Sequence, residues 1–381
     1  MTDWYGNRRR ERYTFRRVKW DWDGAQAGPD HFKEGTDYGN VTGGSVSLAA
    51  FTDAKASCSF DFIGGDPPDT TDLVRIYYSF EDDDGNAASI VLGTFFVEYG
   101  STIYESANGG LIAKGTVEGT SVLAALLNRK LGAPYTVEAG DDAIAKADGI
   151  IKGLGLYTND PAGSYIISAA HTFEPEDSYM TVVNWLLSSA NYRAAYPNER
   201  GTVIIAPAQS EGGIAVTFRD DERSIMLAEV TQENDWQATP NVARLNYESD
   251  EESLFAVAYN RSGNRASLDA RGGRELTFAE TVTELEGATQ ADRIAALKEM
   301  AKQRLLDQST EIEKATLTHA LIDNMGPNVA VAIEYSGKRW SGNIVNMDIS
   351  LEASTPCTTK LRRFITAALE IETEGGAIWT A

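Results

Sequence analysis

The sequence contains three histidines, His31, His171 and His319, and each stands far from the others along the chain. None of them belongs to an HExxH pattern or another spacing that places histidines together around a metal ion. His319 lies in a stretch of alternating apolar and polar residues, which is typical of a packed or surface residue in a strand. The histidines therefore predict no metal site.

Two short segments approach known ligand-binding loops. The segment from Gly153 to Thr158 begins like a dinucleotide-binding loop, but it lacks the third glycine and ends a predicted helix instead of opening one. The segment from Asp82 to Gly85 resembles the centre of a calcium loop, yet Phe80 and Val91 stand where that loop needs carboxylates. We interpret it as a solvated hairpin tip, and we expect neither a cofactor nor a metal.

Carboxylates also fail to define a hydrolase. Glu174, Glu176 and Asp177 precede a predicted helix, where acidic groups stabilise the N-terminal end of the helix dipole. A glycosidase needs two carboxyl groups that face each other across a sugar, and the sequence has no motif that places them so. It also has no GxSxG elbow, no P-loop and no Cys-His signature of a thiol hydrolase. We expect no catalytic residue.

Composition indicates a globular protein. The chain has 381 residues, of which 42% are hydrophobic and 24% charged, and this length suits two or three domains. No apolar stretch approaches the roughly 20 residues that span a bilayer, and no hydrophobic signal core follows the first charges. We expect a soluble protein, made in the cytoplasm, without stable membrane insertion. Cys58 and Cys357 are far apart, and we expect free thiols rather than a disulfide.

The formal net charge is -22, which argues against binding by neutralisation of nucleic-acid phosphates. We expect DNA to be repelled or to pass without specific binding. The N-terminus is an exception because basic residues crowd it. These residues are Arg8, Arg9, Arg10, Arg12, Arg16, Arg17 and Lys19. This basic arm is either a solvated tail or a segment that docks on an acidic face of a neighbouring subunit. Ile378 and Trp379 are apolar residues near the other end, which either anchor the next protein or belong to a disordered tail.

Apolar periodicity predicts strands in the first and last thirds of the chain and helices in the middle. Strands are expected near 46–62, 73–80, 89–99 and 111–118, followed by a short helix that Ser121 caps. The middle third reads as a small α/β insert, with one helix after Asp142 and another after Asp177 or Ser178. The last third has strands on both sides of a helix that a capping box of Thr289 and Asp292 opens. We predict an α+β protein dominated by β-structure.

Several stretches together resemble the hub proteins of phage tails and contractile injection systems. They are Pro134 to Leu156, Phe173 to Pro207, and the last third from NVARLNYES through ADRIAALKEMAKQRLLDQS to GNIVNMDISLE. The resemblance covers about Tyr13 to Ile371 and rests on patterns of apolar and turn residues. It implies two tail-tube-like β-sandwich or barrel domains, each with a packed helix, at 13–128 and 236–372. The basic arm would then occupy 1–12, the α/β insert 129–235, and a C-terminal tail 373–381.

The resemblance implies a mechanical function. Two tube-like domains per subunit would let three subunits form a ring with pseudo-sixfold symmetry, which joins a sixfold tail tube to a threefold tip and lines the DNA channel. The implied partners are further copies of the chain, a distal tail or tail-tube protein above, a tip or fibre protein below, and the tape-measure protein. The protein would reside at the tail tip of the virion, after assembly in the host cytoplasm.

Three alternatives remain open. A distal tail protein would form a hexameric ring with one tube-like domain and a carbohydrate-binding or fibre-attaching domain. Another minor tail protein that attaches fibres would share the same composition. A cell-wall glycan hydrolase would need a cleft with converging carboxylates. Because the chain ends ten residues after Ile371, we expect no lytic or receptor-binding module on it.

Overall fold

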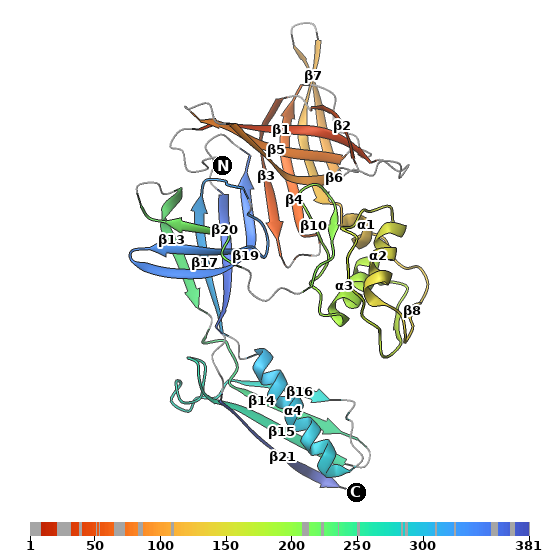
Figure 1. Ribbon diagram of the computed structural model, residues 1–381, viewed down its shortest axis with the longest axis vertical. Helices are drawn as coiled ribbons and strands as arrows, with labels where there is room; N and C mark the ends of the chain where they lie inside the picture. The colour runs from red at the N-terminus through yellow and green to blue at the C-terminus, as the bar shows by residue number, and fades with distance from the viewer. Residues whose placement is uncertain are drawn as a thin grey trace. The chain divides into compact units, whose positions relative to one another are not determined.

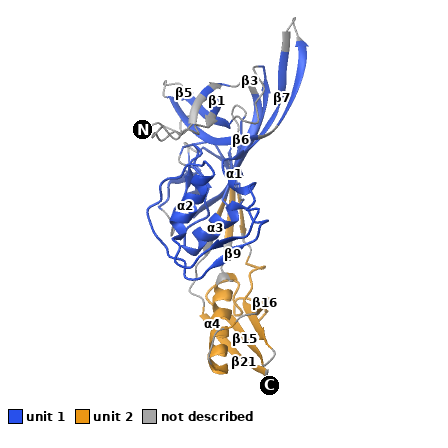
Figure 2. Cartoon of the chain, turned by 90° about the vertical axis from the view of Figure 1, so that its right-hand side faces the viewer, with its two compact units in different colours: residues 1–230, 317–360 blue, residues 231–316, 361–381 orange. Residues whose placement is uncertain are grey.

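The structure is a computed structural model. It describes residues 9–20, 32–37, 40–50, 52, 54–64, 73–82, 87–107, 110–207, 213–221, 225–234, 236–249, 252–282, 285, 289–308, 311–323, 325–351, 357–365 and 370–380. The chain divides into two compact units, which Figure 2 colours separately. Unit 1 comprises residues 1–230 and 317–360, and unit 2 comprises residues 231–316 and 361–381. The described residues are mainly strands, with four helices, so the predicted α+β, β-dominated fold class is confirmed.

The N-terminal part of unit 1 is a strongly curved antiparallel sheet (Figure 1). Its strands are β1 (Arg9–Trp20), β2 (Phe32–Asp37), β3 (Asn40–Ala49), β4 (Ala56–Ile63), β5 (Leu73–Asp82), β6 (Ala87–Ala107) and β7 (Gly110–Ser121). Their order in the sheet is β3-β4-β7-β6-β5-β1-β2. The inward side chains alternate along each strand and are large and aromatic, as the rings of Phe15 and Phe60, 4.6 Å apart, illustrate. This sheet therefore has an apolar core of its own.

The sheet continues into strands that follow the insert in the sequence. These strands are β12 (Val216–Arg219), β13 (Met226–Asn234), β17 (Glu311–His319), β18 (Ala330–Tyr335), β19 (Lys338–Ser350) and β20 (Cys357–Ile365). β19 pairs with β3, from Asn346 opposite Ala49 to Ser350 opposite Ser45, and β20, β17 and β13 follow in order. β18 pairs with β19 and, in parallel, with β12. One sheet of 13 strands thus contains residues from both predicted tube-like domains.

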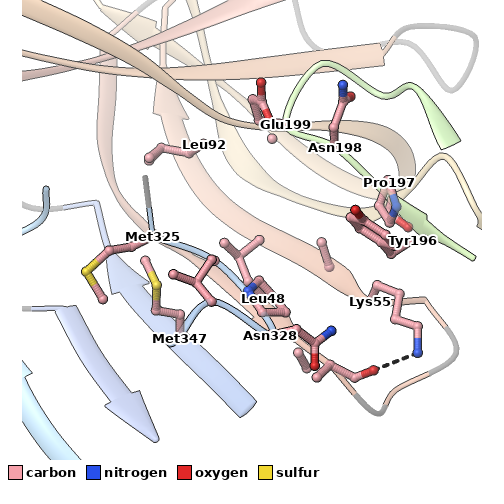
Figure 3. Close-up of a pocket in the computed structure, with 18 of the residues that line it drawn as sticks. Leu48, Lys55, Leu92, Tyr196, Pro197, Asn198, Glu199, Met325, Asn328 and Met347 are labelled. Atoms are coloured by element: carbon pink, nitrogen blue, oxygen red, sulfur yellow. Dashed lines mark hydrogen bonds between the residues drawn. The ribbon is translucent and has the colours of Figure 1, made fainter. Parts of the chain in front are cut away.

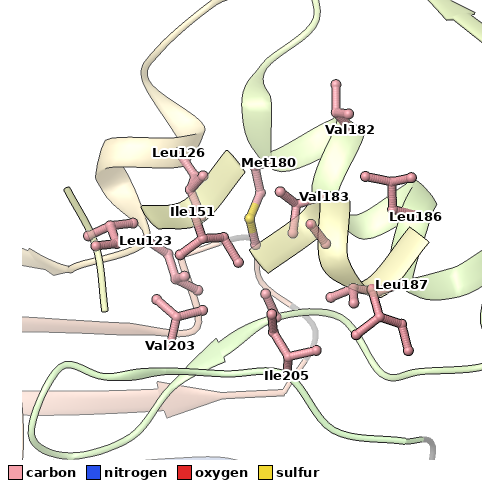
Figure 4. Close-up of a cluster of buried hydrophobic side chains, with 14 of the residues drawn as sticks. Leu123, Leu126, Ile151, Met180, Val182, Val183, Leu186, Leu187, Val203 and Ile205 are labelled. Atoms are coloured by element: carbon pink, nitrogen blue, oxygen red, sulfur yellow. The ribbon is translucent and has the colours of Figure 1, made fainter. Parts of the chain in front are cut away.

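The α/β insert follows β7 and packs on one end of this sheet. It contains α1 (Ala124–Leu127), β8 (Tyr135–Val137), α2 (Ala143–Gly153), β9 (His171–Phe173), α3 (Tyr179–Ser189), β10 (Tyr196–Pro197) and β11 (Val203–Ile204). Its core joins Ile151 of α2 to Met180 and Leu187 of α3 (Figure 4). Val18 of β1 and Leu73 of β5 belong to the same buried cluster. The insert and the sheet are therefore held together by continuous apolar packing, whose burial contributes roughly 1.5 to 3 kcal/mol per large side chain.

The insert consists of one β-turn-α pattern used twice, which we call the first repeat (129–156) and the second repeat (165–192). Equivalent residues lie 36 positions apart, as Thr136 and Thr172 do. These two threonines face each other in the antiparallel β8–β9 pair, so a local twofold axis passes between them. The backbone hydrogen bonds repeat too: Tyr165 O accepts from Ala143 N, and Arg129 O accepts from Tyr179 N. The sequence did not suggest this duplication.

Both repeats start and stop their helices in the same way. Asp142 caps α2 by accepting from the backbone of Ile144 and Ala145, and Ser178 caps α3 by accepting from Thr181. The helices end at equivalent left-handed positions, Gly155 with φ 79° and Asn191 with φ 57°. The sequence predicted a helix after Asp142 and a cap at Asp177 or Ser178 for the next helix; both helices are confirmed, and Ser178 is the cap of the second.

Unit 2 is a four-stranded sheet covered by one helix. The sheet order is β16 (Thr277–Val282), β14 (Val242–Glu248), β15 (Glu252–Ser262) and β21 (Glu370–Thr380), with only the β14–β16 pair parallel. α4 (Gln290–Gln308) packs on one face through Leu297, Ala301 and Leu305. The predicted capping box is confirmed, because Thr289 Oγ1 accepts from Asp292 N and Asp292 Oδ2 accepts from Thr289 N.

Some local predictions differ from the structure. α1 is a single turn whose N-cap is Leu123, so the prediction that Ser121 caps it is wrong; Ser121 Oγ instead accepts from Leu123 N two residues on. Strand β1 begins at Arg9, inside the segment expected to be an arm. Strand β21 occupies most of the segment expected to be a tail. The assignment of two tail-tube-like domains to 13–128 and 236–372 stays a prediction.

Candidate interaction surfaces

The residues considered for catalysis lie apart in the structure. His171 is exposed and stacks on Trp185 with ring centroids 4.6 Å apart, whereas His319 is buried in another part of unit 1. Asp177 accepts from the backbone of Glu174, so this acidic cluster organises the turn before α3. No three His, Cys, Asp or Glu residues of the described chain could together hold a metal ion. His31 and the tip at 83–86 lie outside the described residues.

His319 is part of a buried polar chain between strands β17 and β20. Its Nε2 lies 2.7 Å from Thr359 Oγ1, its Nδ1 lies 2.8 Å from Ala320 O, and its ring packs on Phe218. Burial lowers the pKa of His319 to about 4, so the imidazole is neutral at physiological pH. A neutral imidazole with both nitrogens engaged serves the fold, because it satisfies the polar groups around it.

Both cysteines are buried free thiols, as predicted. Cys357 lies beside the same polar chain, with Sγ 3.7 Å from Thr359 Oγ1. Burial raises the pKa of the Cys357 thiol to about 12, which keeps it protonated. Neither thiol is exposed, as a reactive cysteine usually is.

The basic N-terminal residues lie partly in a strand. Arg10 and Arg12 are exposed on β1, where their backbones pair with Glu81 and Ser79 of β5. Arg9 pairs with Asp82 through the backbone, and Arg8 lies outside the described residues. The strand fixes Arg10 and Arg12 on one face, because side chains two apart point to the same side.

The apolar residues near the C-terminus lie at a sheet edge. Ile378 is 60% exposed on β21, and the backbone of Trp379 pairs with Ser253 of β15. In the ladders of the described residues β21 has a neighbour on one side only. An open edge beside an exposed isoleucine is a surface on which another chain can add.

The β6–β7 hairpin carries a second exposed apolar surface, which sequence reasoning missed. Beyond Phe96 the described part of β6 pairs only with β7, and the β4–β7 ladder ends at Lys114, which lies opposite Ile103. The described ends of the two strands, 103–107 and 110–114, therefore project as a ribbon from the sheet (Figures 1 and 2). Ile103, Tyr104 and Ile112 are exposed on this ribbon, and Lys114 forms an ion pair with Glu105. A free two-stranded ribbon is marginally stable in water, so packing against a partner would stabilise it.

Unit 1 also contains a cavity of about 980 Å³ between the sheet, the insert and the segment 321–330. Figure 3 shows Met325 and Met347 on one wall and Tyr196 with Pro197 on another. The walls are mainly apolar, and methionine side chains adapt to many shapes, so the cavity suits an apolar group. At its rim the guanidinium carbon of Arg193 lies 4.1 Å from the centre of the Tyr196 ring.

A buried arginine fixes the turn that borders this cavity. Arg75 of β5 is fully buried, and its guanidinium donates to Thr94 Oγ1 at 3.0 Å and to Arg200 O at 3.1 Å. Thr94 Oγ1 in turn donates to Glu199 O at 3.0 Å. The turn from Asn198 to Gly201 is therefore bound to the sheet by one charge-assisted hydrogen bond from Arg75 and one neutral hydrogen bond from Thr94.

Comparison with known proteins gives a match at the level of the fold. No protein-family model matches the chain, and no curated protein matches it in sequence. Among solved structures, a tail protein from Neisseria meningitidis MC58 has a TM-score of 0.58 at 14% identity, over 93% of this chain and 96% of that one. The 43 kDa tail protein of prophage MuSo2 from Shewanella oneidensis has a TM-score of 0.59 at 12% identity, over 92% and 98% of the two chains.

A third similar structure belongs to a protein complex from Francisella. A chain of the Francisella PdpA-VgrG complex has a TM-score of 0.53 at 8% identity, over 96% of this chain and 55% of that one. The chain therefore has the fold of phage tail proteins, and the resemblance noted in the sequence is confirmed at the level of the fold. Within the described residues no helix is long and apolar enough to cross a membrane.

Proposed function

We propose that this protein is a structural subunit of the tip of a phage tail or a related injection device, with no catalytic activity. The main support for the proposal is that almost the whole chain shares its fold with two tail proteins. A shared fold alone does not fix a function. The proposal gains support from the scattered placement of the candidate catalytic residues and from the exposed apolar surfaces, which suit assembly.

The assembly we propose is a ring of three subunits, the hub between a sixfold tail tube and a threefold tip. Open sheet edges support such a ring, because a chain that joins its neighbours through strands needs an unpaired edge. β16 and β21 of unit 2 each pair on one side only in the described ladders. A head-to-tail interface that repeats by rotation closes into a ring.

We infer that the ring lines the DNA channel without binding DNA. The net charge of -22 supports this inference, since carboxylates in the lumen repel phosphates and let the duplex slide. The proposed partners are a distal tail or tail-tube protein above, a tip or fibre protein below, and the tape-measure protein. The protein would be a component of the virion tail tip, assembled in the host cytoplasm.

Arg8, Arg9, Arg10, Arg12, Ile378 and Trp379 remain the proposed docking residues between subunits. The exposure of Arg10, Arg12 and Ile378 supports this role. Charged residues at the rim of an interface mainly steer association and fix its register, whereas an apolar residue such as Ile378 contributes binding free energy by burying its surface. We therefore expect Ile378→Asp to weaken assembly more than Arg12→Ala does.

Native mass spectrometry at several protein concentrations tests the proposed ring. We expect a trimer that becomes more abundant as the concentration rises. A hexamer would instead favour a distal tail protein, which the sequence left open as an alternative. A monomer at every concentration would contradict a ring that forms from this chain alone.

A further inference from the structure

The two repeats of the insert differ in the ring contact between strand and helix. In the second repeat, His171 of β9 stacks on Trp185 of α3 with an angle of 13° between the rings, and Phe173 meets the same indole edge-on. The equivalents of His171 and Trp185 in the first repeat, 36 residues earlier, are Tyr135 and Gly149. The first repeat therefore keeps the ring on the strand but lacks the indole on the helix.

The place of the missing indole, which we call the open place, has no side chain on α2. Gly149 is exposed on α2, and a Cβ built on it meets no atom within 4 Å. Tyr135 is half-buried, and the ammonium of Lys146 lies 5.6 Å from the centre of its ring. The same scaffold stacks an indole in the second repeat, so an aromatic ring from another molecule fits on Tyr135 in the first.

The charges around this open place favour a ligand that is positively charged outside its aromatic ring. The surrounding stretch from 135 to 160 carries more carboxylates than amines. The carboxylates are Glu138, Asp141, Asp142, Asp148 and Asp160, and the amines are Lys146 and Lys152. Lys152 is bonded to Asp148 and Asp160, and Lys146 to Asp141, so the excess charge is negative. A segment that joins an aromatic ring to several basic residues complements this surface.

The N-terminus of the chain itself has this composition. Trp4 and Tyr5 are followed by Arg8, Arg9 and Arg10, and strand β1 begins only at Arg9. We propose that the segment from Trp4 to Arg10 of one copy docks on the first repeat of a neighbouring copy, with the Trp4 indole stacked on Tyr135 beside Gly149. The arginines then lie near the carboxylates of α2.

The length of β1 favours a segment that comes from another copy. Val18 packs in the core of the insert, whereas Arg9 is at the opposite end of β1. Nine residues of strand at roughly 3.3 Å each separate these ends by about 30 Å. Trp4 precedes Arg9 by five residues, which reach at most about 18 Å when fully extended. To reach its own insert, the segment would have to run back along almost the whole length of β1, so we expect the indole to come from another copy.

This inference rests on the proposed function, because it needs several copies of the chain in one assembly. It adds the contact that would join them. One copy gives its N-terminal segment and receives the segment of the next at a different surface, which is the head-to-tail arrangement that a closed ring requires.

A fluorescently labelled peptide of residues 1–12 tests the docking site directly. The receptor is the full chain with Trp4→Ala, whose own segment competes weakly, and fluorescence anisotropy measures the binding. We expect saturable binding that weakens at least tenfold with Tyr135→Ala. The same loss is expected with Gly149→Trp, which fills the open place from within. Gly149→Ala is the matched control and should bind the peptide as the parent does, because its Cβ meets no neighbour.

Equal peptide affinity for the Gly149→Trp, Tyr135→Ala and parent receptors would overturn the inference, as would no binding at millimolar peptide. Circular dichroism confirms that each variant is folded. Native mass spectrometry of the same proteins separates this inference from the proposed function. If the wild type is a trimer but the peptide does not bind, the proposed docking site is contradicted and the proposed ring is supported. If the peptide binds but the chain stays monomeric, the docking site is supported and a ring that forms from this chain alone is contradicted.

Discussion

Thr136 and Thr172 face each other across the β8–β9 pair with their hydroxyl oxygens 2.9 Å apart, and they occupy the same position in the two repeats of the insert. A residue that meets its own equivalent marks a twofold axis. The helices α2 and α3 are related by this axis and bury their apolar faces against each other. The insert is thus stabilised as one body, although each repeat alone offers only a short strand and one helix.

A glycine in α2 lowers the stability of the insert. Gly149 lies inside the helix with ordinary dihedral angles and open space at its Cβ, so Gly149→Ala restricts the unfolded chain without a clash. We expect a gain of about 0.5 to 1 kcal/mol in the free energy of unfolding, measured by urea denaturation of the full chain. Gly163→Ala is the contrasting variant and should destabilise, because φ is 142° and the added Cβ comes 2.4 Å from the Tyr192 hydroxyl. Stabilisation by both variants would contradict this account.

Arg75 binds the turn at 198–201 to the sheet through hydrogen bonds. Arg75→Leu removes the donors to Thr94 and Arg200 O and leaves buried acceptors unsatisfied. We expect a loss of roughly 3 kcal/mol or more in unfolding free energy, together with faster hydrogen exchange at Thr202 and Val203. Arg244→Leu, whose ion pair with Glu275 is exposed, should cost less than about 1 kcal/mol. Similar losses for the two variants would refute the special role of Arg75.

His319 makes the protein sensitive to mild acid. Its pKa is about 4 in the folded protein and near 6.5 in the unfolded chain. Below pH 6.5 the unfolded chain therefore binds a proton that the folded protein does not bind, and stability falls until the pH reaches about 4. Between pH 6.5 and 5 the loss is about 2 kcal/mol at 1.36 kcal/mol per pH unit.

Urea unfolding of the wild type and of His319→Gln at pH 7.5 and pH 5 measures this contribution. The glutamine retains hydrogen-bonding groups but does not titrate, so the variant should lose less stability on acidification than the wild type does. His171→Gln changes an exposed histidine and serves as the control. An equal acid-induced loss in wild type and His319→Gln would show that the histidine does not cause it.

The two thiols should be unreactive in the folded protein. Cys58 and Cys357 are buried, and the raised pKa of Cys357 further reduces its thiolate fraction. We expect Ellman's reagent at pH 8 to label neither thiol within minutes, and to label both after unfolding in urea. Rapid labelling of Cys357 without urea would show that β20 opens readily.

Local features of this fold could be predicted from the sequence because their causes are local. Asp142 and Thr289 cap helices through side-chain groups that lie within three residues of the bonded amides. The β18–β19 turn follows from Ser336 and Gly337, which both adopt positive φ in a two-residue loop.

Long-range features could not be predicted in this way. β19 pairs with β3 through Asp348 and Ser47, which lie 301 residues apart, and nothing local to either strand specifies the partner. The duplication in the insert left a weak signal as well. From the strand onward, the identical residues in the two repeats are Thr136, Glu138 and Asp141, which recur as Thr172, Glu174 and Asp177. Tyr135 and Gly149 can be recognised as the equivalents of His171 and Trp185 only once the structure reveals the two repeats.

The absence of catalytic motifs was visible in the sequence, whereas the interaction surfaces were visible only in part. The basic residues at 8–12 and the apolar pair at 378 and 379 stood out from their surroundings. The exposed ribbon with Ile103, Tyr104 and Ile112 did not stand out, because the sequence pattern of an apolar strand is the same whether or not a second layer covers the strand.

Cryo-electron microscopy of the purified, assembled protein tests the central claim most directly. The account predicts a ring of three subunits around an opening wide enough for a DNA duplex, with carboxylates facing the opening and the subunits joined head to tail. A compact assembly without an opening, or a ring whose lumen is lined with lysine and arginine, would contradict it.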